Sequence, residues 1–166
     1  MIKKLVLFLL FGNMLFAEIT NIPATPKFVE ETKLKIIDIR TKGEWLQMGT
    51  VKDAYLITFF DEQYGYNPKK FLDDLNDVVK KDEEFAIICN SGSRTKLISN
   101  FLGNKHKYKV VNLTGGMLNL LKEGYKPEVY NRSTTQLSKQ KIVSASELLK
   151  KESEPLPEIK ENNSSK

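Results

Sequence analysis

Cys89 is the only cysteine in the chain, and it stands where a nucleophile would. It follows the apolar run 85–88 and precedes a short polar loop, after which a helix is expected from Ser93. The first turn of a helix presents free N–H groups and a partial positive charge, so it favours an anion. A thiol in such a place ionises more readily than a free one. We therefore predict that Cys89 is a catalytic nucleophile.

The first 17 residues have the pattern of a secretory signal peptide. Lys3 and Lys4 precede the apolar stretch 5–16, and Ala17 is a small residue after which cleavage could occur. The stretch is shorter than the roughly 20 residues that span a bilayer. An uncleaved N-terminal anchor is the alternative. We expect an exported protein, in the periplasm of a bacterium.

Export strengthens the argument for a reactive thiol at Cys89. Cysteines of exported proteins usually form disulfides in pairs, and an odd one indicates a reactive thiol or an intermolecular bridge. The alternative is an inert cysteine buried at a strand end. The polar loop that follows Cys89 favours the reactive thiol.

The remaining chain divides into a globular part, 18–130, and a tail, 131–166. The globular part contains 17 basic and 16 acidic residues, and this balance argues against a nucleic-acid-binding surface. The tail is rich in Ser, Lys, Glu and Asn and has few large apolar residues. This composition predicts a disordered segment.

Short apolar runs alternate with helical patterns through the globular part. Strands are expected at 35–39, 55–57, 85–88 and 110–113. Helices are expected at 26–33, 41–48, 71–79, 93–102 and 116–121, with Gly103 ending the fourth. Thr41 and Glu44 have the spacing of a capping box. Apolar strands that alternate with helices predict an α/β fold whose parallel sheet is covered on both faces.

Three polar segments follow the ends of predicted strands. They are 38–40, the loop after Cys89, and the turn 114–116. Ligands of parallel sheets bind at the carboxyl ends of the strands. We therefore expect these segments to converge on one crevice.

Three stretches of the chain together resemble the rhodanese family of sulfurtransferases. They are 36–41 with Glu44 and Trp45, then 89–95, then 110–116, and they occur in the family's order. The resemblance covers residues 19–128 and implies a rhodanese-like fold, with a central parallel sheet of about five strands flanked by helices on both faces. The chain departs from the family at 49–54, Gly-Thr-Val-Lys-Asp-Ala, where a Gly-His-Ile-Pro-Gly-Ala stretch is common. That change affects the rim of the pocket more than the fold.

The resemblance implies a thiosulfate sulfurtransferase. The Cys89 thiolate would take the sulfane sulfur of a donor such as thiosulfate, hold it as a persulfide and pass it to cyanide or a thiol. The covalent persulfide would replace any cofactor, and no metal is expected. The expected partners are a small sulfur anion and its acceptor, which could be a protein. Neither nucleic acid nor a membrane span after signal removal is expected.

The loop after Cys89 is the predicted substrate-binding segment. Gly92 permits a positive φ, so the loop can curl and direct successive main-chain N–H groups at the sulfur. Arg94 either binds an oxyanion or forms an ion pair with Asp38 that braces the loop. Asp38 and Arg40 are predicted to support the loop. The predicted substrate-binding residues are Asn90, Ser91, Gly92, Ser93, Arg94 and Thr95.

Two other functions remain open. A cysteine phosphatase or arsenate reductase places five residues between its cysteine and arginine, whereas four lie between Cys89 and Arg94. The smaller loop fits one sulfur better than a phosphate. A persulfide carrier or binding module would load Cys89 but turn over little. A dithiol redox protein is disfavoured, because the chain holds no second cysteine that could resolve a disulfide.

Overall fold

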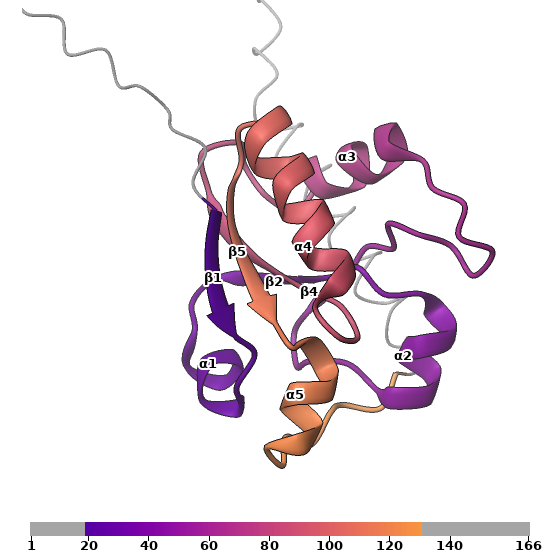
Figure 1. Cartoon of the computed structure of the whole chain (residues 1–166), viewed down its shortest axis with the longest axis vertical. Helices are drawn as coiled ribbons and strands as arrows, with labels where there is room; N and C mark the ends of the chain where they lie inside the picture. Colours follow the sequence, from indigo (N-terminus) through magenta and orange to yellow (C-terminus); the bar gives the residue numbers. More distant parts are fainter. Residues whose placement is uncertain (1–18, 131–166) are drawn as a thin grey trace, which may run out of the picture. The chain divides into compact units, whose positions relative to one another are not determined.

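The computed structural model describes residues 19–130 (Figure 1). The predicted signal peptide, 1–17, and the predicted tail, 131–166, lie outside the described residues. The strands are β1 (Ile19–Pro23), β2 (Lys35–Asp38), β3 (Tyr55–Leu56), β4 (Glu84–Ile88) and β5 (Lys109–Thr114). The helices are α1 (Pro26–Glu31), α2 (Lys42–Met48), α3 (Pro68–Asn76), α4 (Ser93–Asn100) and α5 (Gly116–Lys122), and α4 continues into the π-helical segment η1 (Phe101–Lys105).

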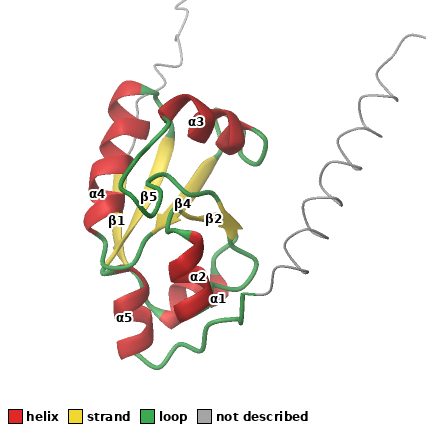
Figure 2. Cartoon of the chain, turned by 90° about the vertical axis from the view of Figure 1, so that its right-hand side faces the viewer, coloured by secondary structure: helices red, strands yellow, loops and turns green. Residues whose placement is uncertain are grey.

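The five strands form one parallel sheet in the order β1-β5-β4-β2-β3. Helices surround it, as the colours of Figure 2 show. The predicted α/β architecture is confirmed. Within residues 19–130, no helix has the length and apolar character needed to cross a membrane.

Helix starts follow the capping residues that the sequence indicates. Thr25 accepts a hydrogen bond from the Phe28 N–H at 3.2 Å, and Pro26 occupies the first turn of α1. Before α2, Thr41 Oγ1 accepts from the Glu44 N–H at 3.3 Å, and the Glu44 carboxylate accepts from the Thr41 N–H at 2.9 Å. The predicted capping box is therefore present.

Alternation along the strands divides the core into two apolar layers. On one face Phe85 and Ile87 of β4, together with Cys89 directly after the strand, pack with residues of α3 and α4. On the other face Ala86 and Ile88 pack with residues of α1 and α5. The carboxyl end of β4 is thus packed on both faces, and this packing fixes the position at which the following loop begins.

Strand β1 was not predicted from the sequence. Its residues, Ile-Thr-Asn-Ile-Pro, lack a continuous apolar run, because β1 is an edge strand that pairs with β5 alone. The pairing that creates this strand lies about ninety residues away in the sequence, with Ile19 opposite Val110.

The prediction that Gly103 ends the fourth helix is wrong. The chain continues through η1 to Lys105, with Gly103 inside it. A Cβ at Gly103 would lie 2.5 Å from Ile19 Cγ1. This glycine is therefore needed for close packing against β1, and it does not act as a helix stop.

Asp38 and Arg40 form a wholly buried ion pair beneath the carboxyl ends of the strands. Arg40 Nη2 lies 2.6 Å from Asp38 Oδ2, and both side chains are fully buried. Arg40 also donates to the Gly49 carbonyl at 2.7 Å, so the pair ties the end of β2 to the end of α2. Burying two charges is costly, and the pair persists because each charge meets the other.

We expect removal of either partner to cost more than removal of both. Asp38→Leu or Arg40→Met leaves one uncompensated buried charge and should lower the free energy of unfolding by about 3–5 kcal/mol. The double variant Asp38→Leu/Arg40→Met should recover most of that loss. Urea denaturation of the four proteins measures this coupling, and simply additive losses would contradict it.

Candidate active site

The sulfur of Cys89 lies at the carboxyl end of β4, immediately before the loop that leads into α4. The Gly92 main-chain N–H donates to Sγ at 3.2 Å. The Cys89 thiol lies 3.8 Å from Thr95 Oγ1, which in turn donates to the Gly92 carbonyl at 3.0 Å. The loop thus curls around the sulfur, as predicted, with Gly92 at its tightest point.

The Cys89 sulfur is more deeply buried than predicted. Cys89 is 0% exposed and belongs to the apolar layer of Phe85 and Ile87, because all three point to the same face of β4. In the described part of the chain, Gly92 supplies the one main-chain N–H that donates to Sγ. The expected ring of several amides around the sulfur is therefore not formed in this state.

Two glycine-dependent contacts hold the loop in place. Gly92 has φ +87°, and a Cβ there would lie 2.7 Å from the Gly115 nitrogen. Gly116 has φ +57°, and a Cβ there would lie 2.3 Å from the Cys89 carbonyl oxygen. Only glycine fits at both positions, because the two backbones touch and the left-handed conformation disfavours side chains.

The start of α5 completes this contact. The Met117 N–H donates to the Cys89 carbonyl and the Leu118 N–H to the Asn90 carbonyl, both at 2.9 Å. These are first-turn N–H groups that have no partner inside their own helix. The predicted convergence of the Cys89 loop with the 114–116 turn is confirmed.

Arg94 pairs with Glu44, so of the two roles predicted for Arg94 the ion pair with Asp38 is wrong. Arg94 Nη1 donates to Glu44 Oε2 at 2.8 Å, and Nη2 donates to Oε1 at 2.5 Å. Asp38 is already engaged by Arg40 in a wholly buried pair. Glu44, held by the Thr41 N–H at the start of α2, is therefore the residue that braces the loop.

Charge around this pair favours the ionised forms of both groups. Burial alone would raise the pKa of Glu44, but hydrogen bonds from Arg94 and the Thr41 main chain outweigh burial and hold that pKa below its ordinary value. The hydrogen bond to Glu44 raises the pKa of Arg94, and attraction to Cys89 and Asp38 adds to the effect. Arg94 thus places a permanent positive charge within electrostatic range of the sulfur.

The other predicted loop residues do not contact the sulfur through a hydrogen bond within the described structure. Ser91 and Ser93 are exposed, and their hydroxyl oxygens lie 3.1 Å apart. Asn90 Oδ1 is buried and has no hydrogen-bond partner among the described residues. Asp38 and Arg40 make no hydrogen bond to residues 90–95 within the described structure, and they influence the loop through their charges near Arg94 and Glu44.

Sequence reasoning missed Glu44 as a site residue. Its local role in the capping box was clear, but the contact with Arg94 joins residues fifty positions apart. No cluster of three His, Cys, Asp or Glu side chains suited to a metal ion occurs within residues 19–130.

The sequence model of the rhodanese-like domain matches residues 25–123. The chain belongs to the rhodanese-like domain family. Membership supports a sulfurtransferase role or a related one. Rhodanese-like domains also occur in phosphatases and other modules. The predicted family and fold are thereby confirmed.

Several solved structures are similar to this rhodanese-like chain. A rhodanese-like domain protein from Staphylococcus aureus is 27% identical, over 66% of this chain and 98% of that one, with a TM-score of 0.49. A protein from Staphylococcus saprophyticus is 26% identical, over 63% and 97% of the two chains, with a TM-score of 0.47. A rhodanese-related protein from Thermoplasma volcanium is 18% identical, over 63% and 94%, with a TM-score of 0.46. No curated protein matches the chain at a significant level.

The Glu44–Arg94 pair predicts a pH-dependent stability for this rhodanese-like domain. Because the folded-state pKa of Glu44 is lowered, its contribution is present above the ordinary value of 4.5 and is lost as the pH falls through the folded-state value. Near neutral pH, Glu44→Gln should be less stable than wild type by about 1 kcal/mol. The difference should shrink on acidification to about pH 3.

Thermal unfolding across this pH range measures the difference. Glu84→Gln is the matched control, because Glu84 is exposed and makes no side-chain hydrogen bond within the described residues. A Glu44→Gln deficit that stays constant with pH would contradict the assignment.

The contact between Gly92 and Gly115 predicts unequal costs for two glycine substitutions. Gly92 and Gly124 have nearly the same φ, +87° and +86°, so alanine at either position costs about 1 kcal/mol in backbone strain. Only Gly92 would also drive its Cβ into main chain, since nothing lies within 4 Å of a Cβ at Gly124. Gly92→Ala should therefore lower the free energy of unfolding clearly more than Gly124→Ala. Equal losses in urea denaturation would contradict this prediction, because they would mean that the loop shifts away from Gly115 at no cost.

Proposed function

We propose that this protein is a sulfurtransferase of the rhodanese type that carries a sulfane sulfur on Cys89. The observation that carries the proposal is the hydrogen bond of 3.2 Å from the Gly92 N–H to the Cys89 sulfur. It lies in a loop that requires glycine at position 92, at the end of a parallel strand. An N–H donor at this place stabilises a negatively charged sulfur, first as thiolate and then as persulfide.

In the first step the Cys89 thiolate attacks the outer sulfur of a donor such as thiosulfate. The new bond joins Sγ to that sulfur, while the bond within thiosulfate breaks and its electron pair leaves with sulfite. In the second step an acceptor such as cyanide takes the outer sulfur, forms thiocyanate and restores the thiolate. A thiol, either small or on a partner protein, could take the place of cyanide. The sulfur travels on the protein itself, so the cycle needs no metal or cofactor.

The loop groups have distinct roles in this proposal. Thr95 can turn its hydroxyl from the Gly92 carbonyl to the sulfur once the sulfur is charged, because the two lie 3.0 and 3.8 Å away. Arg94 contributes charge while remaining held by Glu44. The exposed hydroxyls of Ser91 and Ser93 are placed to meet the oxygens of an arriving anion. Because Sγ is enclosed, the backbone of 90–93 must open for the donor to reach it.

One observation favours a second candidate, a persulfide carrier with little turnover. The Cys89 side chain is 0% exposed, and a small acceptor would meet the same barrier in every cycle. A carrier would instead open on contact with a partner protein. A phosphatase is less well supported, since the loop of four residues between Cys89 and Arg94 is short for a phosphate.

The signal-peptide pattern of the first residues supports a location outside the cytoplasm for this reaction. We propose the periplasm of a bacterium as its location, on the pattern of residues 1–17. A reactive single thiol is consistent with that compartment, because Cys89 has no second cysteine in the chain with which to form a disulfide.

We expect thiosulfate to add the mass of one sulfur atom to the wild-type protein and none to Cys89→Ser. Intact mass spectrometry measures loading, and sulfite and thiocyanate release are assayed separately in the presence of cyanide. Stoichiometric sulfite with sustained thiocyanate supports the sulfurtransferase, whereas one equivalent of sulfite without thiocyanate supports the carrier. Absence of loading with thiosulfate and with polysulfide would refute both.

A further inference from the structure

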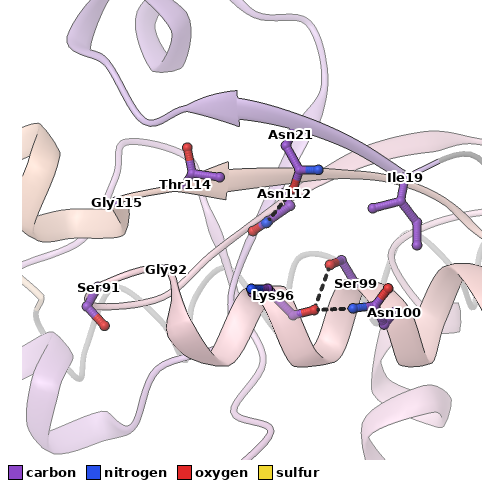
Figure 3. A pocket seen from close by; sticks show the side chains of 10 residues that line it. All are labelled: Ile19, Asn21, Ser91, Gly92, Lys96, Ser99, Asn100, Asn112, Thr114 and Gly115. Atoms are coloured by element: carbon purple, nitrogen blue, oxygen red, sulfur yellow. Dashed lines mark hydrogen bonds between the residues drawn. The ribbon is translucent and has the colours of Figure 1, made fainter.

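A cavity lies beside the Cys89 loop, between α4 and the strands β1 and β5 (Figure 3). Its volume is about 480 Å³, within the range of roughly 300–1,000 Å³ that small-molecule sites occupy. Ser91 and Gly92 form one end of it, but Cys89 is not among the residues that line it. Apart from Ser91 and Gly92 at that end, the mechanism proposed above assigns no role to its lining residues.

The cavity exists because the apolar side chains on this face of the sheet end before the carboxyl ends of β1 and β5. On this face β1 and β5 present the pair Ile19 and Val110, and the next pair on the same face is Asn21 and Asn112. Helix α4 packs on β4 and β5 and presents Ser99 and Lys96 to the uncovered edge. Figure 3 shows Asn21 and Asn112 on the strands facing α4 across the cavity. Polar groups therefore occupy positions that an apolar core would otherwise fill.

Asn112 has an unused hydrogen-bond acceptor in this cavity. Its side chain is 2% exposed, and its Nδ2 donates to Asn21 Oδ1 at 2.7 Å. Its Oδ1 is buried and accepts no hydrogen bond from any described residue. Buried polar atoms are rarely left without a partner, so this oxygen is a candidate acceptor for a donor on a bound molecule.

The same cavity offers positive charge and no negative charge. Lys96 lines it, and its ammonium group makes no ion pair or hydrogen bond within residues 19–130. None of the described lining residues is acidic. The Ser99 hydroxyl donates to the Lys96 carbonyl, and the groups that we assign to a ligand are the Lys96 ammonium, the Asn21 amide N–H and the Asn112 carbonyl oxygen.

We propose that this cavity is a binding site for a small carboxylate that carries a neighbouring N–H group, the pattern of an acylated amino acid or the end of a short peptide. The carboxylate lies on Lys96 and Asn21, where a cation and an amide N–H meet it. The N–H donates to Asn112 Oδ1 and satisfies the buried acceptor. The site is separate from the sulfur chemistry, although its ligand contacts the Ser91–Gly92 segment of the Cys89 loop.

Three related probes separate the two interactions. N-acetylglycine carries both the carboxylate and the N–H, N-acetylsarcosine lacks the N–H, and N-acetylglycinamide lacks the charge. Titration of each into the isotope-labelled protein is followed at the main-chain amides of Gly92 and Asn112. We expect N-acetylglycine to bind about tenfold more tightly than either of the other two probes, from one charge-assisted and one buried hydrogen bond.

Two variants and a control assign the effect to the named groups. Lys96→Gln should remove the preference for N-acetylglycine over N-acetylglycinamide, and Asn112→Leu the preference over N-acetylsarcosine. Lys126→Gln, at an exposed lysine outside the cavity, should change neither. The comparison of probes on the wild type stands even where Asn112→Leu fails to fold.

No response of these amides to N-acetylglycine would overturn the proposal, as would equal affinity for the three probes. Binding that survives in Lys96→Gln with its preference unchanged would also overturn it. Because binding needs no sulfur transfer, a protein that fails to load sulfur on Cys89 can still pass this test, and the reverse holds as well.

Discussion

Close contact between two main-chain segments is the constraint on which this site depends. The segment after β4 and the turn after β5 approach until a Cβ at Gly92 or Gly116 would overlap backbone atoms of the other segment. This contact fixes where Gly92 points its N–H, and hence where the Cys89 sulfur meets a donor. It also directs the first N–H groups of α5 to the Cys89 and Asn90 carbonyls. The chemistry at the sulfur thus depends on residues that have no reactive group.

A second layer of control is electrostatic and comes from the other side of the loop. Glu44 stands at the start of α2, where the Thr41 N–H fixes one of its oxygens, and it holds the Arg94 guanidinium by both nitrogens. Beneath it the buried pair of Asp38 and Arg40 keeps the ends of β2 and α2 together. Positive charge is therefore fixed near Cys89 without a direct bond to the sulfur. An arginine held in this way cannot close over a substrate unless Glu44 releases it.

Local signals in the sequence were sufficient for much of this arrangement. The capping box at Thr41 and Glu44, the apolar runs of β2, β4 and β5, and the glycines of the two turns predicted the α/β fold and the approach of the Cys89 loop to the 114–116 turn. What failed depended on contacts between distant residues. The edge strand β1 exists through β5, Gly103 is small because Ile19 lies against it, and Arg94 selects Glu44 because Asp38 is already paired. Composition and residue spacing do not indicate such contacts between distant residues.

Complete burial of the Cys89 sulfur limits the access of other molecules to it. An enclosed thiol beside an N–H donor is shielded from solvent, and under the proposed function residues 90–93 would have to move before a sulfur donor could reach it. The glycines that allow the closed loop also make its backbone permissive, while the contacts with Gly115 and α5 anchor only the Cys89–Asn90 end and Gly92. Ser91 and Ser93 remain exposed on either side of Gly92. If Cys89 reacts as proposed, its reactivity depends on how readily this loop opens, and a partner or ligand that touches Ser91 or Gly92 would change that equilibrium.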